Sequence, residues 1–180
     1  MKIILIGIQG SGKSTQGNLL SKNLGVPYLS TGHIFREMAK EKTPLGRKVK
    51  EIMTAGLLQP DDLTVQVVET YLQKPEYAKG YIMDGFPRTL EQVEKFQNGV
   101  DKVICLGISD KEALLRLAYQ NDGTRPDDSA EAIEKRIELF HLVTQPVIDH
   151  YKQKGMLVEV DGEQTIEEIH QQILKALGKN

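Results

Sequence analysis

Cysteine is nearly absent from this chain, with Cys105 the one example among 180 residues. A single cysteine excludes a disulfide within the chain. It also excludes a zinc site built from several cysteine ligands. Such low cysteine usage is typical of a reducing compartment, so we expect a cytoplasmic protein without zinc.

The chain also lacks an excess of charge of one sign and lacks long apolar runs. Lys plus Arg total 23 and Asp plus Glu total 25, a formal net charge of −2. This balance argues against the basic field of a nucleic-acid binder.

No apolar run approaches the roughly 18 residues of a membrane span. The run from Ile3 to Ile8 is shorter than the roughly 7–15 residues at the centre of a signal peptide. We expect no nucleic-acid or membrane partner and, since no feature indicates association, a monomer.

Arginine is the scarce cation. The basic residues comprise 17 lysines and six arginines. Arginine is the residue that binds phosphate in a bidentate way, so the positions of these six residues carry information about function. They are Arg36, Arg47, Arg88, Arg116, Arg125 and Arg136.

Five short apolar runs alternate with segments of helical spacing. Strands that are apolar along their whole length and alternate with helices are typical of a parallel sheet covered on both faces. The sequence therefore predicts a doubly wound α/β fold with a five-stranded parallel sheet. The predicted strands are Lys2–Gly7, Val26–Leu29, Gly80–Asp84, Lys102–Ile108 and Met156–Val160.

Three pairs of residues predict helix starts. Thr43 precedes Pro44, and Asp128 with Glu131 and Thr165 with Glu168 have the spacing of capping boxes. Residues 30–59 contain two helical stretches with no strand between them, and basic residues outnumber acidic ones there. This segment is either a solvated helical face or an inserted flap that receives an anion.

The strongest motif follows the first strand. Gly7-Ile8-Gln9-Gly10-Ser11-Gly12-Lys13-Ser14 fits the phosphate-binding pattern G-x-x-x-x-G-K-[ST]. Its glycines let successive backbone N–H groups face a phosphate chain, and the helix that follows adds a partial positive charge. Lys13 would reach the terminal phosphates and the Ser14 hydroxyl would lie beside Mg²⁺. The alternative is an ordinary glycine-rich turn, but the complete motif between strand and helix favours a nucleoside-triphosphate site.

Asp84 ends the third predicted strand, where a carboxylate next to a P-loop suits the Mg²⁺ side of such a site. Its alternative role is to open the turn at Gly85. Arg88 follows where a phosphate clamp would be useful. Gln92 has an alternative role too, because Thr89 and Gln92 have the spacing of a capping box. The chain contains neither the guanine-reading motif of switch GTPases nor the signature of transporter ATPases, so a small phosphotransferase or a nucleotide-dependent binding protein remains.

These motifs resemble those of the nucleoside monophosphate kinases, and among them adenylate kinase. The resemblance runs along the whole chain, and Asp-Gly-Phe-Pro-Arg downstream of a P-loop is its most specific part. It implies reversible phosphoryl transfer from MgATP to AMP, giving two ADP. The segments that carry the resemblance are Ser14-Thr15-Gln16, Leu29-Ser30-Thr31-Gly32-x-x-x-Arg36, Gly56-Leu57-Leu58, Asp84-Gly85-Phe86-Pro87-Arg88-Thr89, Arg125-Pro126-Asp127-Asp128 and Glu134-Lys135-Arg136.

The resemblance also implies a division of the chain. Residues 1–29, 60–118 and 129–180 would form the P-loop core, residues 30–59 a flap that binds the monophosphate, and residues 119–128 a short lid. Lys13, Arg88, Arg125 and Arg136 would take part in transfer. ATP would bind Gly10, Ser11, Gly12, Lys13, Ser14, Thr15, Arg116, Gln120 and Gln164. AMP would bind Thr31, Gly32, Arg36, Leu57, Leu58, Gln59, Gly85, Phe86, Pro87, Arg88, Gln92, Arg125 and Arg136. Mg²⁺ would be held by Ser14 and, through water, by Asp84.

The sequence departs from the family pattern at several positions. Gln9 stands where proline is usual, Ser14 where glycine is usual, and His33 where an acidic residue is usual. Gln120 stands where a second lid arginine is usual.

Two alternatives to an AMP kinase therefore stay open. One is a UMP/CMP kinase, against which Thr31, Thr89 and Gln92 argue. The other is a nucleotide-dependent regulatory protein with weak kinase activity, which Gln120 and His33 favour.

The missing lid arginine generates a prediction. We expect Gln120→Arg to raise turnover by at least about tenfold, because arginines at phosphoryl-transfer sites neutralise charge in the transition state. A coupled assay of ADP formation measures the change. Tyr119→Arg, which adds the same charge one residue away, is the control. An unchanged turnover in Gln120→Arg contradicts the prediction.

Overall fold

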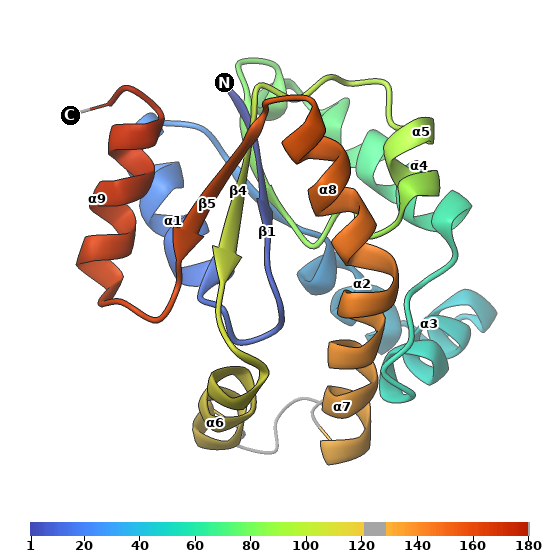
Figure 1. Ribbon diagram of the computed structural model, residues 1–180. Coiled ribbons are helices and arrows are strands. Elements are labelled where there is room, and N and C mark those ends of the chain that lie inside the picture. Colours follow the sequence, from blue (N-terminus) through green and yellow to red (C-terminus); the bar gives the residue numbers. More distant parts are fainter. Residues whose placement is uncertain (121–128, 180) are drawn as a thin grey trace.

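The computed structural model describes residues 1–120 and 129–179, and at their centre lies a parallel sheet of five strands in the order β2-β3-β1-β4-β5. All four strand pairs are parallel. The carboxyl ends of the strands therefore share one edge, the lower edge in Figure 1. The predicted doubly wound α/β fold is confirmed. The strands are β1 Lys2–Ile6, β2 Tyr28–Ser30, β3 Tyr81–Asp84, β4 Lys102–Gly107 and β5 Leu157–Asp161.

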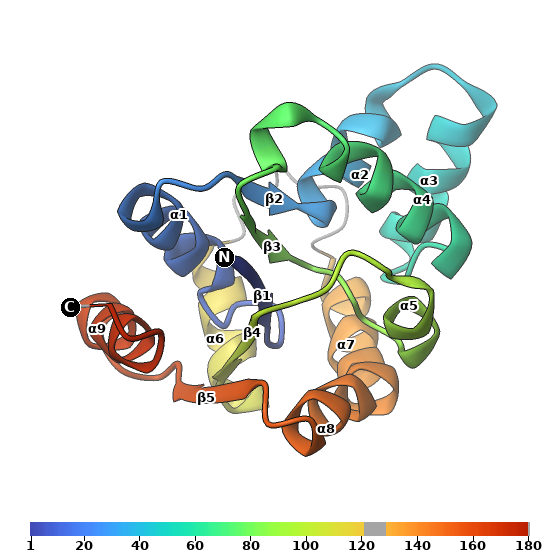
Figure 2. The ribbon, with the colours of Figure 1, turned by 90° about the horizontal axis from the view of Figure 1, so that it is seen from above.

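Helices cover both faces of the sheet. Seen from above, α1 and α9 lie on one side of the strands, and α5, α7 and α8 lie on the other (Figure 2). A 3₁₀ turn, Pro75–Tyr77, precedes β3, and a π-helical turn, Phe140–Thr144, joins α7 to α8. No helix within the described ranges has both the length and the apolar composition needed to cross a membrane. The helices are α1 Lys13–Leu24, α2 Thr31–Lys40, α3 Pro44–Thr54, α4 Asp61–Leu72, α5 Leu90–Lys95, α6 Asp110–Gln120, α7 Ala130–Leu139, α8 Gln145–Gln153 and α9 Ile166–Ala176.

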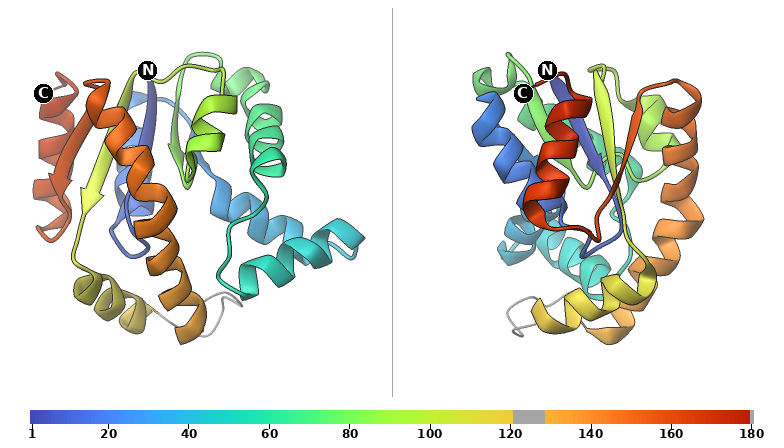
Figure 3. Two further views of the ribbon diagram at one scale, coloured as in Figure 1. Left: turned by 45° about the vertical axis from the view of Figure 1, so that its right-hand side comes forward. Right: turned by 60° about the vertical axis from the view of Figure 1, so that its left-hand side comes forward.

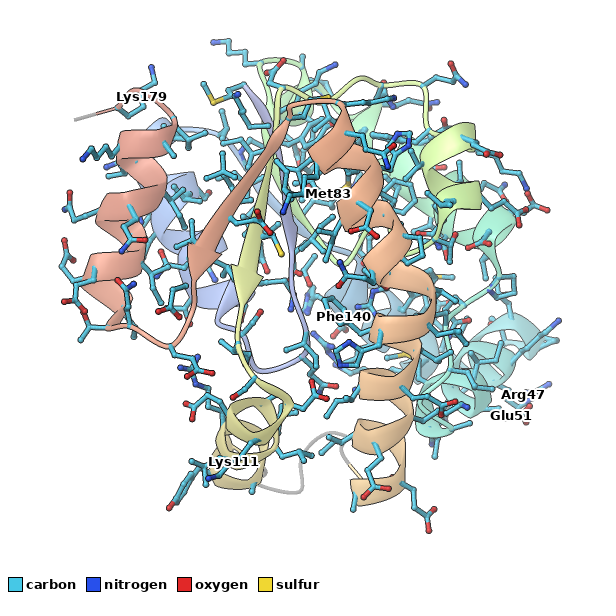
Figure 4. All side chains as sticks on the ribbon, viewed as in Figure 1. Arg47, Glu51, Met83, Lys111, Phe140 and Lys179 are labelled. Carbon is cyan, nitrogen blue, oxygen red and sulfur yellow. The ribbon has the colours of Figure 1, made fainter. Side chains whose placement is uncertain are left out.

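The strands divide the apolar core into two layers because successive side chains point to opposite faces. Ile4 and Met83 belong to the layer between the sheet and α8, where Met83 is labelled in Figure 4. Ile3, Leu5 and Ile82 belong to the layer beneath α1 and α9. Both layers are buried, which explains why these strands are apolar along their whole length.

Two helices extend away from the sheet. Helices α2 and α3 project from the body beside β2 (Figure 3). They share a small apolar cluster, Phe35, Val49 and Met53, which also packs against α4. The predicted break at Thr43 is confirmed, because the Thr43 Oγ1 accepts a hydrogen bond from the Gly46 N–H and Pro44 follows in the first turn of α3.

The helix-start predictions have two outcomes. At Thr165 the capping box is confirmed, since the Thr165 hydroxyl accepts from the Glu168 N–H while the Glu168 carboxylate accepts from the Thr165 N–H. The predicted cap at Asp128 was wrong. Helix α7 is capped one residue later by Ser129, whose Oγ accepts from the Ala132 N–H. Asp128 itself lies outside the described residues, and Ser129 has the same capacity to accept a hydrogen bond.

The core generates a prediction for stability. Leu20 is fully buried in the layer beneath α1, whereas Leu115 on α6 is 48% exposed. We expect Leu20→Ala to lower the free energy of unfolding by about 2–5 kcal/mol, because it removes packed apolar volume. Leu115→Ala, the matched control, should change it by less than about 0.5 kcal/mol. Urea denaturation measures both, and similar losses in the two variants contradict the described packing.

Candidate active site

A cavity of about 280 Å³ opens at the edge of the sheet where the strands end. It is the place where a doubly wound sheet binds its ligands. Eighteen of the residues singled out from the sequence line it. They are Gly10, Gly12, Lys13, Ser14, Thr15, Thr31, Gly32, Arg36, Leu57, Leu58, Gln59, Asp84, Gly85, Phe86, Pro87, Arg88, Gln92 and Arg136.

The loop between β1 and α1 forms one wall of the cavity. Gly10 and Gly12 have positive φ angles of 85° and 92°, which glycine adopts without strain. The N-terminus of α1 begins at Gly12 without a side-chain cap, whereas Ser30, Thr43, Thr89, Ser129 and Thr165 cap other helices. The first N–H groups of α1 therefore have neither a helical partner nor a capping side chain. This geometry suits an anion.

Lys13 bends back over this loop. Its Nζ donates to the carbonyl oxygens of Gly7, at 2.8 Å, and Ile8, at 2.9 Å. Burial lowers the pKa of the ammonium, and the negative charge of Asp84 counteracts part of that shift. The charge is removed from water but held by backbone dipoles, so it is placed to attract a phosphate group.

Asp84 faces the same cavity from the end of β3. Its side chain is buried, and Oδ2 accepts a hydrogen bond of 2.8 Å from the Tyr28 hydroxyl. The other oxygen, Oδ1, is buried without a hydrogen-bond partner among the described residues. A buried carboxylate oxygen without a partner carries a cost unless a ligand satisfies it. With the Ser14 hydroxyl in the same cavity, the oxygen donors fit a magnesium ion or its bound water.

The segment after β3 packs closely against α2. A Cβ atom at Gly85 would stand 2.5 Å from the Thr31 Oγ1, and Gly85 has a φ of 84°. The Thr31 hydroxyl donates to the Asp84 carbonyl at 3.2 Å. The Arg88 Nε donates to the Gly85 carbonyl at 3.0 Å, and the bond between Phe86 and Pro87 is cis. Because Thr31 binds the Asp84 carbonyl and Arg88 binds the Gly85 carbonyl, Arg88 lies close to the first residues of α2.

Gln92 is 2% exposed and holds this segment together. Its Oε1 accepts from the Arg88 N–H at 2.7 Å, and its Nε2 donates to the Asp61 carboxylate at 2.7 Å. Its own N–H donates to the Thr89 hydroxyl, so Thr89 caps α5. Gln92 therefore has a structural role in addition to its place in the cavity wall.

Arg136 enters the cavity from α7. Its Nη1 donates to the Gln9 Oε1 at 3.0 Å, and its Nη2 is 3.5 Å from the Met53 carbonyl. Three arginines from three segments, Arg36, Arg88 and Arg136, therefore line one cavity together with Lys13. Arg47 does not belong to this group, since it lies on the outer side of α3 (Figure 4).

Comparison with known proteins places this geometry in a family. The family model described as adenylate kinase matches residues 5–156. An adenylate kinase of Caldicellulosiruptor bescii is 37% identical over 213 aligned positions, covering 99% of each chain. An adenylate kinase of Corynebacterium glutamicum is 39% identical over 186 positions, covering 99% of this chain and all of its own. One of Nocardia farcinica is 36% identical with the same coverage.

The chain belongs to the adenylate kinase family. The resemblance that the motifs suggested is confirmed, and with it the class of activity, a transferase acting between nucleotides. The individual residue assignments remain predictions.

Several residues assigned by the family resemblance lie outside the cavity wall. Ser11 is fully buried and its Oγ is 3.4 Å from the Lys13 Nζ. Arg116 pairs with Glu112 at 2.7 Å and is 3.5 Å from the Gly10 carbonyl. Gln164 lies between β5 and α9, bonded to the side chains of Asp161 and Gln172. Arg125 and the side chain of Gln120 lie outside the described residues.

Twelve residues of the cavity wall were not among the predicted site residues, and Gln9, Phe140 and Thr144 are three of them. Gln9 binds Arg136, and its position inside the P-loop motif was the available signal. Phe140 and Thr144 belong to the π-helical turn, and Thr144 donates to the Arg88 carbonyl at 3.0 Å. A π-helical turn is often found at functional sites, but nothing in this sequence marks it. The motifs that carry the family resemblance do not include these two positions.

The bonds of Gln92 generate a prediction. We expect Gln92→Leu to lower the free energy of unfolding by about 1–3 kcal/mol, because it leaves the Arg88 N–H without its partner. It should also raise KM for AMP, because Arg88 loses its fixed position. Urea denaturation and initial rates measure the two effects. Gln97→Leu, at an exposed position after α5, is the control, and equal stability of the two variants contradicts the role of Gln92.

Proposed function

We propose that this chain catalyses the reversible transfer of the γ-phosphoryl group from MgATP to AMP, giving two ADP. The observation that carries the proposal is a single cavity that has phosphate-binding groups on two of its walls. Lys13 and the uncapped start of α1 form one wall, and Arg36 and Arg88 belong to the other. Arg136, from α7, also lines this cavity. Such an arrangement serves two phosphate-bearing ligands that meet end to end.

ATP would bind along the P-loop. The N–H groups from Gly10 to Thr15 would hold the β- and γ-phosphates, and Lys13 would exchange its backbone partners for phosphate oxygens. Ser14 and Asp84 would hold the magnesium ion, Asp84 through water. Bound there, the ion supplies positive charge that offsets the charge of the phosphates. Arg116, Gln120 and Gln164 would lie beside the nucleoside.

AMP would bind against α2 and the segment after β3. Arg36 and Arg88 would bind its phosphate, since guanidinium groups pair with phosphate in a bidentate way. The adenine would lie against Thr31, Gln92 and the backbone of residues 57–59, with Gly32 and residues 85–87 allowing close approach. Purine recognition through an amide and backbone groups needs one donor and one acceptor, which these groups provide.

The transfer itself needs positioning and charge more than proton chemistry. An oxygen of the AMP phosphate attacks the γ-phosphorus, and a new P–O bond forms. The bond from that phosphorus to the bridging oxygen breaks, and its electron pair stays on the departing ADP. Arg88, Arg136 and Arg125 would stabilise charge on the equatorial oxygens. This chemistry requires no general base, and none is assigned.

We further propose a division into a core of residues 1–29, 60–118 and 129–180, a flap of residues 30–59 and a short lid of residues 119–128. The apolar cluster of α2 and α3, which also packs against Leu63 and Val67 of α4, supports the flap. The aligned length of 213 positions exceeds the 180 residues of this chain, so the Caldicellulosiruptor relative contains sequence that this chain lacks. Closure of flap and lid would exclude water during transfer.

The physiological setting is also a proposal. The near balance of acidic and basic residues supports a protein that binds neither nucleic acid nor membranes. The single cysteine supports a cytoplasmic location, and we propose a monomer because no feature of the sequence indicates association.

An assay of substrate preference tests the proposed reaction. ATP is offered with AMP, CMP, UMP or GMP, and formation of each diphosphate is measured. We expect kcat/KM for AMP to exceed that for the pyrimidine monophosphates by at least about a hundredfold, because buried polar groups shaped for one base leave bonds unmade with another. A preference for UMP or CMP would identify a pyrimidine kinase. Absence of transfer to any monophosphate would support the regulatory alternative.

Lys13→Met separates enzymatic transfer from contamination in the same assay. We expect this variant to lose at least about a thousandfold in kcat/KM, because it removes the cation that reaches the transferred phosphate. Lys111→Met, on the exposed side of α6 (Figure 4), is the matched control and should retain the wild-type rate. Transfer that survives Lys13→Met contradicts the assignment of the P-loop.

A further inference from the structure

Tyr28 is a residue of β2 that no motif singles out. Strand β2 pairs with β3 so that Tyr28 lies opposite Ile82 and Ser30 lies opposite Asp84. From this position the tyrosine side chain extends along the strand toward its carboxyl end. Its hydroxyl donates to the Asp84 Oδ2 at 2.8 Å.

Helix α1, which follows the P-loop, packs beside β2 (Figure 2), and the Tyr28 ring lies against Gly17 of this helix. A Cβ atom at Gly17 of α1 would stand 2.3 Å and 2.7 Å from the Tyr28 ring carbons Cε2 and Cδ2. Any larger residue at position 17 would therefore displace the ring. Gly17 is one helical turn beyond Lys13, so the same turn of helix that begins the phosphate site also makes room for the ring.

The contact leaves the two oxygens of Asp84 in different states. Oδ2 is bound by the tyrosine hydroxyl, and Oδ1 is buried with no hydrogen-bond partner within the described part of the chain. A carboxylate fixed at one oxygen presents the other in one direction.

We propose that Tyr28 is a positioning residue for Asp84. Its hydroxyl holds Oδ2, so that Oδ1 faces the divalent cation, or the cation's bound water, that accompanies ATP, and Gly17 is the residue that permits this contact. The inference rests on the proposed function, since it assigns Asp84 to the metal side of the ATP site. Mutation of a residue that orients a metal's ligand typically lowers metal affinity or activity by about 10–100-fold.

Tyr28→Phe tests the proposal because it removes the hydroxyl and keeps the ring. Two quantities are measured: the Mg²⁺ concentration that gives half-maximal rate, and the affinity for ATP alone, by calorimetry, with Mg²⁺ or with EDTA. We expect the half-maximal Mg²⁺ concentration to rise about tenfold and ATP affinity to fall in Mg²⁺ but stay within about twofold of wild type in EDTA. Calorimetry without AMP gives a readout that does not depend on turnover.

Tyr81→Phe is the matched control. Tyr81 is a buried tyrosine of the neighbouring strand β3, and its hydroxyl donates to the Gly99 carbonyl away from the site. The same atom is thus removed from the same kind of environment. If Tyr28→Phe and Tyr81→Phe have the same Mg²⁺ dependence, the proposal is overturned. An equal loss of ATP affinity in EDTA and in Mg²⁺ also overturns it, because Tyr28 would then act on the fold of the site alone.

Gly17→Ala provides a second, independent variant. It keeps the hydroxyl and moves the ring, so we expect a higher half-maximal Mg²⁺ concentration here too. In the Gly17→Ala background, Tyr28→Phe should have no further effect; an additive effect contradicts the coupling of the two residues. These outcomes differ from a failure of the proposed function. In that case the wild-type chain itself would form no ADP, whatever the Mg²⁺ dependence of ATP binding.

Discussion

The register between β1 and β3 is the constraint on which the site depends. These strands are parallel, and Leu5 of β1 lies opposite Asp84 of β3. The P-loop leaves β1 after Ile6 at the level where Asp84 ends its own strand, and β2 places Ser30 at the same level. One edge of hydrogen-bonded backbone thus brings together the start of α1, the carboxylate and the start of α2. A shift by one residue would turn the Asp84 side chain to the other face of the sheet.

Much of this arrangement is predictable from the sequence because its signals are local. The glycines and Lys13 of the P-loop, the threonine caps at Thr43 and Thr165, and the apolar strands are each read from neighbouring residues. Parallel strands then place their carboxyl ends together without further information. This is why the fold and the P-loop side of the cavity follow from motif and pattern, whereas most of the residues assigned to AMP came from the resemblance to the adenylate kinases.

The contacts that were missed join residues far apart in the chain. Gln9 and Arg136 are separated by 127 positions, and Tyr28 and Asp84 by 56. Neither pair has a sequence spacing that marks it, since each contact depends on how whole helices and strands pack. The error at Asp128 has another origin: Ser129 beside it is an equally good cap, and local propensity cannot choose between adjacent acceptors.

The cations of the cavity already have partners before any nucleotide arrives. Lys13 holds two carbonyl oxygens, Arg88 holds the Gly85 carbonyl and Arg136 holds the Gln9 amide. Substrate binding is therefore an exchange reaction, in which each new phosphate contact replaces an internal one. The net free energy gained is the difference between the two sets of bonds, far less than the number of contacts suggests. The internal bonds that form again when a nucleotide leaves therefore offset part of the free-energy cost of its release.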